Sequence, residues 1–274
     1  MTDTTISTIS ILGCGWLGLP LAKKLLEKGY LVKGSTTTTE KLGVLAESGV
    51  QPFLINLQPS VAEVHQSELY KFLQADILII DIPPRTLIHG DEFHVQQIRS
   101  LAESISIPLP QIIYISSTSV YPDNNQVATE ETEVIESNAM VQAEHLLRNI
   151  SPATTILRCG GLMGYGRIPG KYVAGKTITT GNVPVNFIYR DDVVEVICEV
   201  IKQKKWGVTY NVVAPLHPVR RLVYDQNVKD LGFLPPVYDD STLPAHKIIS
   251  NEKLGQDLKY TFQFPDPVAF PYGS

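Results

Sequence analysis

The chain has 274 residues, of which 43% are hydrophobic and 19% charged, a composition that indicates a folded globular protein and excludes a disordered one. Its formal charge of -5 provides no global positive field, so neither nucleic acid nor an anionic membrane is an expected partner. Three widely spaced cysteines, Cys14, Cys159 and Cys198, predict neither a disulfide framework nor a zinc cluster. The start lacks a basic leader and every apolar run is too short for a membrane span, so we expect a cytoplasmic protein.

From Ile6 onward, short β-branched runs alternate with longer stretches of helical period, which is the pattern of βαβ units that build a parallel sheet. The predicted strands are 8–12, 30–33, 52–57, 77–82, 111–116, 154–159 and 209–213. Most of them are almost continuously apolar, as strands buried on both faces are. The sequence therefore predicts an α/β fold with a Rossmann-type, doubly wound parallel sheet of about seven strands.

The first motif is Gly13-Cys14-Gly15-Trp16-Leu17-Gly18, a G-x-G-x-x-G that follows the first predicted strand and opens a helix. Its first glycine permits a tight turn, its second lets a pyrophosphate approach the backbone, and its third lets the helix pack on the strand. The motif predicts that a dinucleotide binds at Gly13, Gly15, Trp16, Leu17 and Gly18. The alternative is a glycine-rich connector without a function.

The second predicted strand is followed by hydroxyl side chains, and no acidic residue occurs before Glu40. An acid there usually receives the 2′-hydroxyl of an NAD ribose, whereas hydroxyls near Lys33 or Lys41 suit a 2′-phosphate. We therefore expect NADP or NAD as the cofactor, with a small preference for NADP. The alternative is a solvated loop with local side-chain turns. The residues expected at the ribose are Ser35, Thr36 and Thr37.

Two further segments carry candidate site residues. The segment His89-Gly90-Asp91-Glu92-Phe93-His94 places two histidines around two acids, but their five-residue spacing does not suit one helical face. We expect Asp91 to cap a helix and no metal to bind. The run 115–122 gathers hydroxyls at the end of the fifth predicted strand, where they either line a site or only cap the next turn. Its candidate residues are Ser116, Ser117, Thr118 and Tyr121.

Glycine and proline become dense after Gly160, which predicts a division of the chain. We expect residues 1–165, joined by 186–214, to form the dinucleotide-binding domain. The remaining segments, 166–185 and 215–274, are expected to form a small, partly discontinuous C-terminal lobe on the substrate side. Arg167 and Arg190 are either contacts for an anion or ordinary solvated charges.

The glycine motif and the run 115–121 together resemble the extended short-chain dehydrogenase/reductase superfamily. Segments 157–167, 187–193 and 210–212 strengthen this resemblance, and segments 82–85, 90–93 and 260–267 are most similar to its atypical, YeeZ-like members. The similarity runs nearly end to end. It implies an NAD(P) cofactor and an activity like that of NAD-dependent epimerases and dehydratases. It also places Ser117 at the active-site Ser/Thr, and we expect Pro83 and Ser116 to contact the cofactor.

The chain departs from that superfamily in its Tyr-x-x-x-Lys motif. If Glu144 is the glutamate that follows the lysine by four residues, Glu136 occupies the tyrosine position and Met140 the lysine position. Neither side chain can perform the usual proton transfer. Two functions are therefore compatible with the sequence. One is an NAD(P)-dependent epimerase, dehydratase or reductase that acts on a small polar substrate, neutral or anionic. In that case Tyr121 or Tyr165 either supplies a phenol or only packs at the edge of the cleft. The other is a sensor or regulatory module that binds NAD(P) without turnover.

Overall fold

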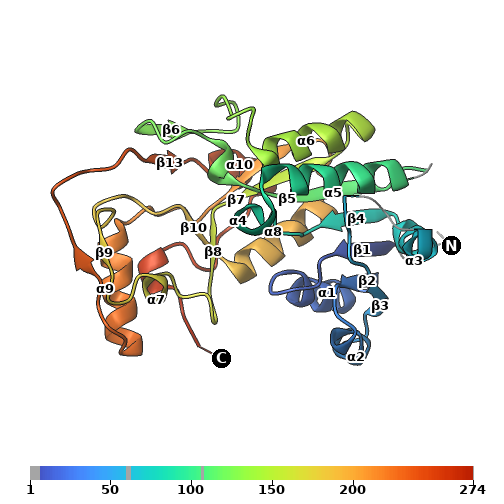
Figure 1. Ribbon diagram of the computed structural model, residues 1–274, viewed down its shortest axis with the longest axis horizontal. Helices are drawn as coiled ribbons and strands as arrows, with labels where there is room; N and C mark the ends of the chain where they lie inside the picture. The colour runs from blue at the N-terminus through green and yellow to red at the C-terminus, as the bar shows by residue number, and fades with distance from the viewer. Residues whose placement is uncertain (1–6, 60–62, 106–107, 274) are drawn as a thin grey trace. The chain divides into compact units, whose positions relative to one another are not determined.

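The computed structural model describes residues 7–59, 63–105 and 108–273 (Figure 1). The chain forms two compact units. Unit 1 comprises Met1–Ser116, Ile135–Leu157 and Lys204–Thr209, and unit 2 comprises Ser117–Val134, Arg158–Gln203 and Tyr210–Ser274. The division into domains expected from the sequence has other boundaries and stays a prediction.

The main sheet has seven strands in the order β11-β7-β5-β4-β1-β2-β3. The chain thus adds strands on one side of β1 as far as β3 and then, from β4 onward, on the other side. This order is doubly wound, confirms the predicted fold class, and puts the topological switch point between β1 and β4. The strands are β1 (Thr8–Leu12), β2 (Leu31–Thr36), β3 (Gln51–Leu54), β4 (Ile77–Ile80), β5 (Gln111–Ser117), β7 (Thr155–Cys159) and β11 (Thr209–Val212).

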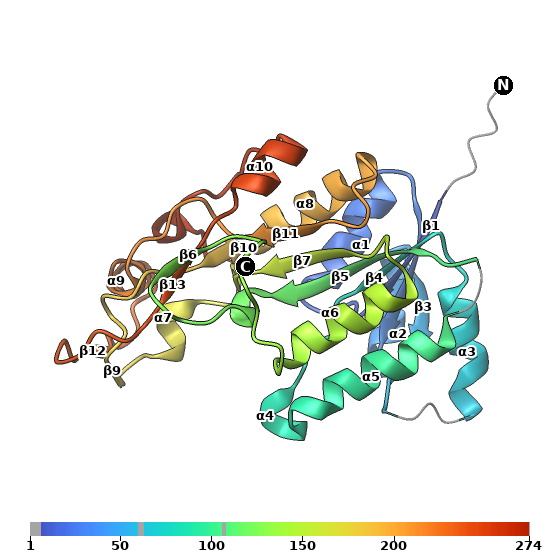
Figure 2. The same ribbon diagram turned by 90° about the horizontal axis from the view of Figure 1, so that it is seen from above.

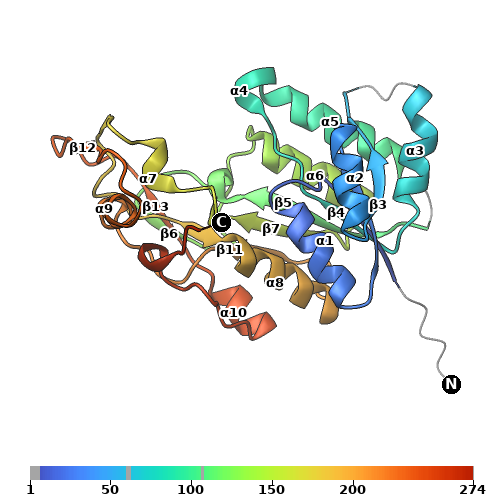
Figure 3. The ribbon, with the colours of Figure 1, turned by 90° about the horizontal axis from the view of Figure 1, so that it is seen from below.

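Helices cover both faces of the sheet in unit 1. Helix α1 lies on one face and α5 and α6 pack together on the opposite face (Figures 2 and 3). Each helix buries an apolar stripe, which in α1 consists of Leu21, Ala22 and Leu25. The helices of this unit are α1 (Gly18–Glu27), α2 (Glu40–Glu47), α3 (Glu63–Leu73), α4 (Thr86–His89), α5 (Asp91–Ser104) and α6 (Ala139–Ile150).

Helix α5 corrects one expectation about its start. The N-cap position is Gly90, with a φ of 79°, and its Asp91 neighbour is the first helical residue. Asp91 therefore does not cap the helix with its side chain, although its negative charge still favours the positive end of the helix dipole. Glycine holds the N-cap position because the backbone there is left-handed.

Unit 2 contains three two-stranded parallel sheets, which pair β6 with β13, β8 with β10 and β9 with β12. Its short elements are η1 (Thr118–Val120), β6 (Gln126–Ala128), β8 (Gly161–Met163), α7 (Pro169–Tyr172), β9 (Thr177–Ile178), β10 (Phe187–Tyr189), β12 (Val237–Tyr238), β13 (Lys247–Ile249) and η2 (Pro267–Ala269). Its longer helices are α8 (Arg190–Lys202), α9 (Arg220–Leu231) and α10 (Glu252–Leu258). No helix among the described residues is both long and apolar enough to span a bilayer.

A buried carboxylate in unit 2 anchors the C-terminal segment. Asp192 of α8 is 0% exposed. It accepts hydrogen bonds from the Tyr260 hydroxyl at 2.6 Å, the Gln263 backbone N–H at 2.8 Å and the Phe264 backbone N–H at 3.0 Å. Burial raises the pKa of Asp192, and the three donors counteract part of that rise. The anchored Phe264 ring then packs on Tyr189, with ring centroids 4.0 Å apart.

Candidate functional site

Two glycines of the turn between β1 and α1 are required by close backbone packing. Gly13 has a φ of +105°, and a Cβ atom there would collide with the backbone carbonyl oxygen of Asp81. A Cβ atom at Gly18 would collide with the carbonyl oxygen of Gly13. These contacts bring the start of α1 directly against the ends of β1 and β4, and no larger residue could replace either glycine without a shift of the backbone.

Gly15 is different, because a Cβ atom there would meet no atom within 4 Å. Gly15 itself is exposed to solvent. Helix α1 follows with Leu17 at its N-cap position, which makes no side-chain capping bond, and the first turn carries no acidic residue. The turn therefore presents an open approach to the positive end of a helix dipole, which is the arrangement that binds phosphate groups.

The hydroxyls at the end of β2 do not all face the same way. The Gly13 backbone N–H donates to Ser35 Oγ at 2.9 Å, so this hydroxyl is tied to the glycine turn. Thr36 is buried and its Oγ1 accepts from the Thr38 N–H at 3.3 Å. Thr37 is exposed. Lys33 is occupied elsewhere, since its ammonium donates to the carbonyls of Lys71 and Gln74 at 2.7 and 2.6 Å.

Asp81 and Cys14 complete the glycine turn, and neither was assigned a role from the sequence. Asp81 directly follows the apolar run of β4, and its Oδ2 would lie 3.3 Å from a Cβ atom at Gly18. Burial, together with the Asp81 charge, raises the pKa of the Cys14 thiol to about 12. Cys14 therefore stays protonated and packs as a small apolar group. The thiol has room to pack because residue 34 is a glycine: a Cβ atom at position 34 would lie only 2.6 Å from the Cys14 sulfur.

Two other expected cofactor contacts lie in unit 1, one after β4 and one near the end of β5. Pro83 is exposed three residues after the end of β4. Ser116 is buried, and its hydroxyl donates a hydrogen bond of 2.5 Å to Glu144 Oε1 of α6. The Ser116 hydroxyl thus belongs to a buried pair beside β5.

The residues at the superfamily's Tyr and Lys positions lie in contrasting surroundings. The Glu136 side chain is 73% exposed, and its Oε2 lies 3.8 Å from Nδ1 of His145. Met140 is only 5% exposed. Its sulfur accepts a hydrogen bond from the Tyr114 hydroxyl at 3.4 Å, and that hydroxyl shares a second bond of 2.7 Å with Nε2 of His94. The Met140 side chain of α6 is therefore buried against Tyr114 of β5 and belongs to the hydrophobic core.

His94 belongs to the same buried cluster, and burial lowers its pKa to about 4, so the ring is neutral near pH 7. Its Nδ1 atom has no hydrogen-bond partner within the described part of the chain. His89 lies apart from this cluster and stacks on Phe93 with ring centroids 4.4 Å apart. Among residues 7–59, 63–105 and 108–273, no three His, Cys, Asp or Glu side chains converge on a metal position.

The expected catalytic residues lie in unit 2. Ser117 is the N-cap of η1, and its Oγ accepts from the Ser119 N–H at 3.1 Å. Thr118 is buried. Tyr121 is 1% exposed, donates to Asn211 Oδ1 at 2.8 Å and accepts from Arg158 Nη1 at 2.8 Å. Burial raises the pKa of the Tyr121 phenol, and Arg158 offsets part of this rise. The sequence analysis missed both partners of Tyr121. Arg158 did leave a signal, because a charged residue in an apolar strand indicates a buried polar contact.

A second polar group of unit 2 surrounds Tyr165, whose φ is 53°. Its hydroxyl donates to Asp191 Oδ2 at 2.7 Å, which is the main reason that the pKa of the phenol is raised. The Arg190 guanidinium lies 3.6 Å from the centre of the Tyr165 ring and 3.1 Å from Asp191 Oδ1. Arg190 is thus held by a ring and a carboxylate, a geometry that leaves less of its charge for a ligand.

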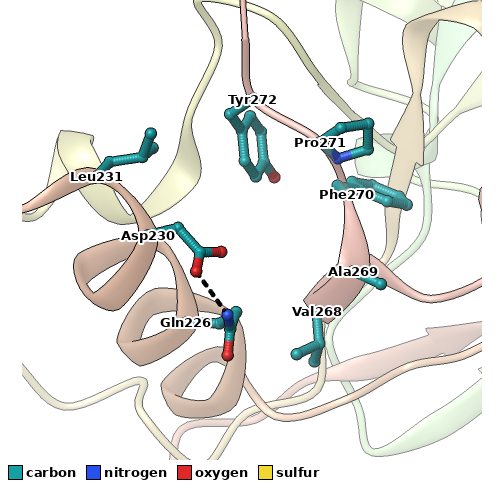
Figure 4. Close-up of a pocket in the computed structure, with 8 residues that line it drawn as sticks. All are labelled: Gln226, Asp230, Leu231, Val268, Ala269, Phe270, Pro271 and Tyr272. Carbon is teal, nitrogen blue, oxygen red and sulfur yellow. Dashed lines mark hydrogen bonds between the residues drawn. The ribbon is translucent and has the colours of Figure 1, made fainter.

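Unit 2 also contains a pocket of about 410 Å³ between α9 and the C-terminal segment (Figure 4). Its polar side is formed by Gln226 and Asp230, which are joined by a hydrogen bond of 2.8 Å. The residues that line it include none of those predicted from the sequence. They are Gln226, Asp230, Leu231, Val268, Ala269, Phe270, Pro271 and Tyr272.

Comparison with known proteins finds relatives both in sequence and in fold. No protein-family model matches the chain. Protein YeeZ of Escherichia coli strain K12 is 36% identical over 271 residues, which cover 96% of this chain and 98% of the relative.

Two solved structures share the fold at lower identity. A UDP-glucuronic acid 4-epimerase from Bacillus cereus, in complex with UDP-glucuronic acid and NAD, superposes with a TM-score of 0.74 at 19% identity, covering 95% of this chain and 96% of its own. A short-chain dehydrogenase/reductase superfamily protein from Agrobacterium tumefaciens with bound NAD has a TM-score of 0.73 at 15% identity, covering 93% and 92% of the two chains.

Proposed function

We propose that this chain, which belongs to the YeeZ family, is a cytoplasmic NAD(P)-binding protein of the epimerase, dehydratase or reductase type. The observation that carries the proposal is the turn of Gly13, Gly15 and Gly18 at the switch point of the sheet. Two of these glycines are fixed by packing, whereas the third faces open space. At the second position of a G-x-G-x-x-G turn that opens a helix, a glycine that packing does not require is explained by a pyrophosphate that must approach the backbone closely.

The residues of unit 1 would hold the dinucleotide as follows. The pyrophosphate would lie over Gly15 and accept hydrogen bonds from backbone N–H groups at Trp16, Leu17 and Gly18, the start of α1. When bound, the nicotinamide ring would supply hydride transfer. We further assign Thr36, Thr37, Pro83 and Ser116 to the walls around the cofactor. Ser35 would act indirectly, because its hydroxyl holds Gly13 in place.

A small preference for NADP over NAD remains part of the proposal. It rests on Thr37, which is exposed after β2, and on the absence of an acid between β2 and Glu40. Lys33 does not support the preference, because its ammonium binds carbonyl groups at the end of α3. Lys41 of α2 is exposed and is the cation that we assign to the 2′-phosphate.

For the chemistry, we assign substrate contacts to Ser117 and Thr118 of unit 2, with Tyr121 as the candidate phenol. The substrate class that we propose is a small polar molecule, and nucleotide sugars come first because the epimerase of the same fold was solved with UDP-glucuronic acid. The buried hydrogen bonds of Tyr121 make it a weak proton donor unless Arg158 or Asn211 moves.

A sensor or regulatory protein that binds NAD(P) without turnover is the second candidate. It is favoured by positions 136 and 140, where an exposed glutamate and a core methionine stand in place of a tyrosine and a lysine. A phenol beside an ammonium shuttles protons near neutral pH, and such assistance contributes about 10²–10⁴-fold in rate. Neither side chain provides it.

The deciding experiment is calorimetric titration with NADH and NADPH of the wild type and Gly15→Val. The valine side chain has room in the protein itself, so the variant should fold normally and lose binding by at least about tenfold, because the branched side chain fills the space of the phosphate. Gly43→Val is the matched control, since its Cβ atom also meets nothing within 4 Å. Equal affinity of Gly15→Val and the wild type would refute the site.

A further inference from the structure

Arg85 has an unusual backbone conformation. Its φ is 51°, in the left-handed region that residues with a Cβ atom rarely adopt. The conformation costs stability at residues other than glycine, asparagine and aspartate, so an arginine there is explained by a use of its side chain. Two prolines, Pro83 and Pro84, come immediately before it and restrict the backbone further.

The side chain of Arg85 is available to a ligand. It is exposed, and it takes part in no hydrogen bond or ion pair with the described residues. Only its backbone carbonyl is used, as an acceptor for the N–H groups of Ile88 and His89 at 3.0 and 3.1 Å. The strained backbone of Arg85 is therefore not explained by a contact between its guanidinium and another described residue. The guanidinium has no partner among the described residues, and the two prolines before it restrict the turn that carries it.

The position of Arg85 in the fold indicates what it would bind. The turn that carries it leaves β4, and β4 pairs with β1 up to Leu12 and Ile80. The Asp81 N–H donates to the Leu12 carbonyl at 2.8 Å, so the turn of residues 81–85 starts beside the glycine turn, at the switch point of the sheet. Ligands of doubly wound sheets bind beyond the carboxyl ends of the strands at this point. A planar guanidinium with two parallel donors fits the oxygens of a phosphate.

We propose that Arg85 is a phosphate-binding residue whose strained backbone is retained for recognition. The proposal rests on the function proposed above, and the phosphate has two possible sources. One is the pyrophosphate of the dinucleotide, and the other is a phosphate group of the substrate. Either source places the guanidinium against anionic oxygens at the ends of β1 and β4.

The test compares Arg85→Ala, Arg85→Lys and Arg85→Gly with the wild type. Arg99→Ala is the matched control, because Arg99 is also an exposed arginine of unit 1 but lies within α5. One calorimetric arm titrates NADH, and a second titrates UDP into protein saturated with NADH or, if NADH does not bind, into the free protein. We expect Arg85→Ala to weaken one of the two probes by about tenfold, the size of a lost charge-assisted contact. Arg85→Lys should recover part of the loss, and Arg99→Ala should change either affinity by less than about twofold.

The glycine variant provides a readout that an ordinary surface arginine would not give. Arg85→Gly should lose as much affinity as Arg85→Ala while its melting temperature rises by about 2–4 °C, because glycine adopts the left-handed backbone without strain. A melting temperature that falls, or affinities for both probes that match those of Arg99→Ala, would overturn the proposal. If Gly15→Val keeps its NADH affinity while Arg85→Ala loses UDP, the proposed dinucleotide site fails and this inference stands. A wild type that binds neither probe contradicts both.

Discussion

The hydroxyl of Ser35, at the end of β2, accepts a hydrogen bond from the backbone N–H of Gly13, with 2.9 Å between nitrogen and oxygen. The first glycine of the turn thus depends on a side chain from the neighbouring strand. Ser35 is buried, so its removal would leave the N–H of Gly13 without this acceptor. We expect Ser35→Ala to lower the free energy of unfolding by about 1–2 kcal/mol, the usual cost of a buried donor that loses its partner.

Urea denaturation followed by circular dichroism measures this loss. Ser48→Ala is the appropriate control, because Ser48 caps the end of α2 and its hydroxyl makes only a local, exposed hydrogen bond to the Val44 carbonyl. Its unfolding midpoint should shift much less. A Ser35→Ala variant as stable as Ser48→Ala would mean that the bond to Gly13 contributes nothing to the turn.

The second prediction concerns cofactor choice. Lys41→Ala should weaken NADPH binding by up to about fivefold and leave NADH binding unchanged, since an exposed ion pair contributes at most about 1 kcal/mol. Lys33→Met should not alter the NADPH to NADH ratio, because the Lys33 ammonium binds the end of α3. Competition titrations with both cofactors decide the matter. Tighter binding of NADH than NADPH by the wild type would contradict the preference itself.

The third prediction follows from the depressed pKa of His94, which burial lowers to about 4 from an ordinary value of 6.5. The unfolded chain therefore binds a proton between pH 6.5 and 4 that the folded chain does not, so stability is lost as the pH falls through this range. Between pH 6.5 and 5, where most carboxylates remain ionised, we expect the loss to be about 1.6 kcal/mol.

His94→Gln provides the comparison for this pH dependence, because glutamine can bond to Tyr114 but does not titrate. Denaturant midpoints measured at pH 7, 6 and 5 should fall more steeply for the wild type than for the variant. The pKa of His217 is also lowered by burial, and its effect is present in both proteins and cancels in the difference. Parallel curves would show that His94 is not protonated on unfolding in this range.

The fourth prediction is that any hydride transfer does not depend on positions 136 and 140. A turnover screen with sugar nucleotides and small carbonyl compounds should give equal rates for the wild type, Glu136→Gln and Met140→Leu. Ser117→Ala and Tyr121→Phe should lower the rate if those residues serve the reaction. Turnover that collapses only in Glu136→Gln or Met140→Leu would overturn the prediction, whereas tight cofactor binding without turnover in any variant supports the sensor.

Met140→Lys should not restore a superfamily active site. Position 140 faces Tyr114 and is nearly inaccessible, so a lysine there would have to bury its charge or deprotonate. We expect Met140→Lys to destabilise the protein while Met140→Leu costs less than about 1.5 kcal/mol, the usual limit for a swap that conserves volume. Thermal melting of the two variants is the measurement.

Much of the sheet could be predicted from the sequence, because strands that are buried on both faces consist of almost continuous runs of apolar residues. The bounds of β1 agree with the expected 8–12. Strand β2 was predicted to end at Lys33 but continues to Thr36, since the polar residues at its end are buried by contacts with the glycine turn. Such contacts depend on the tertiary fold and leave no local signal.

The short strands of unit 2 could not be predicted for the same reason. Strands β6 and β13 pair residues such as Val127 and Ile248, which are far apart in the chain, and each strand has only three residues. The sequence left two interpretations of Tyr121 open, a phenol that reaches the substrate and a tyrosine that packs. Its 1% exposure and its hydrogen bonds with Arg158 and Asn211 agree with packing, but the identity of these partners depends on the tertiary fold and left no local signal.

The contact between Cys14 and Gly34 links two positions in the evolution of this family. The thiol fills the space that a side chain at 34 would need, with 2.6 Å between the sulfur and a Cβ atom built there. Val50 Cγ1 would lie 2.7 Å from the same Cβ atom, so position 50 is part of the constraint. Relatives that carry alanine or serine at 34 should therefore have glycine or alanine at 14 and a side chain smaller than valine at 50. The apparently free second position of the glycine motif is thus constrained by the neighbouring strand. A search for this motif alone would overlook that constraint.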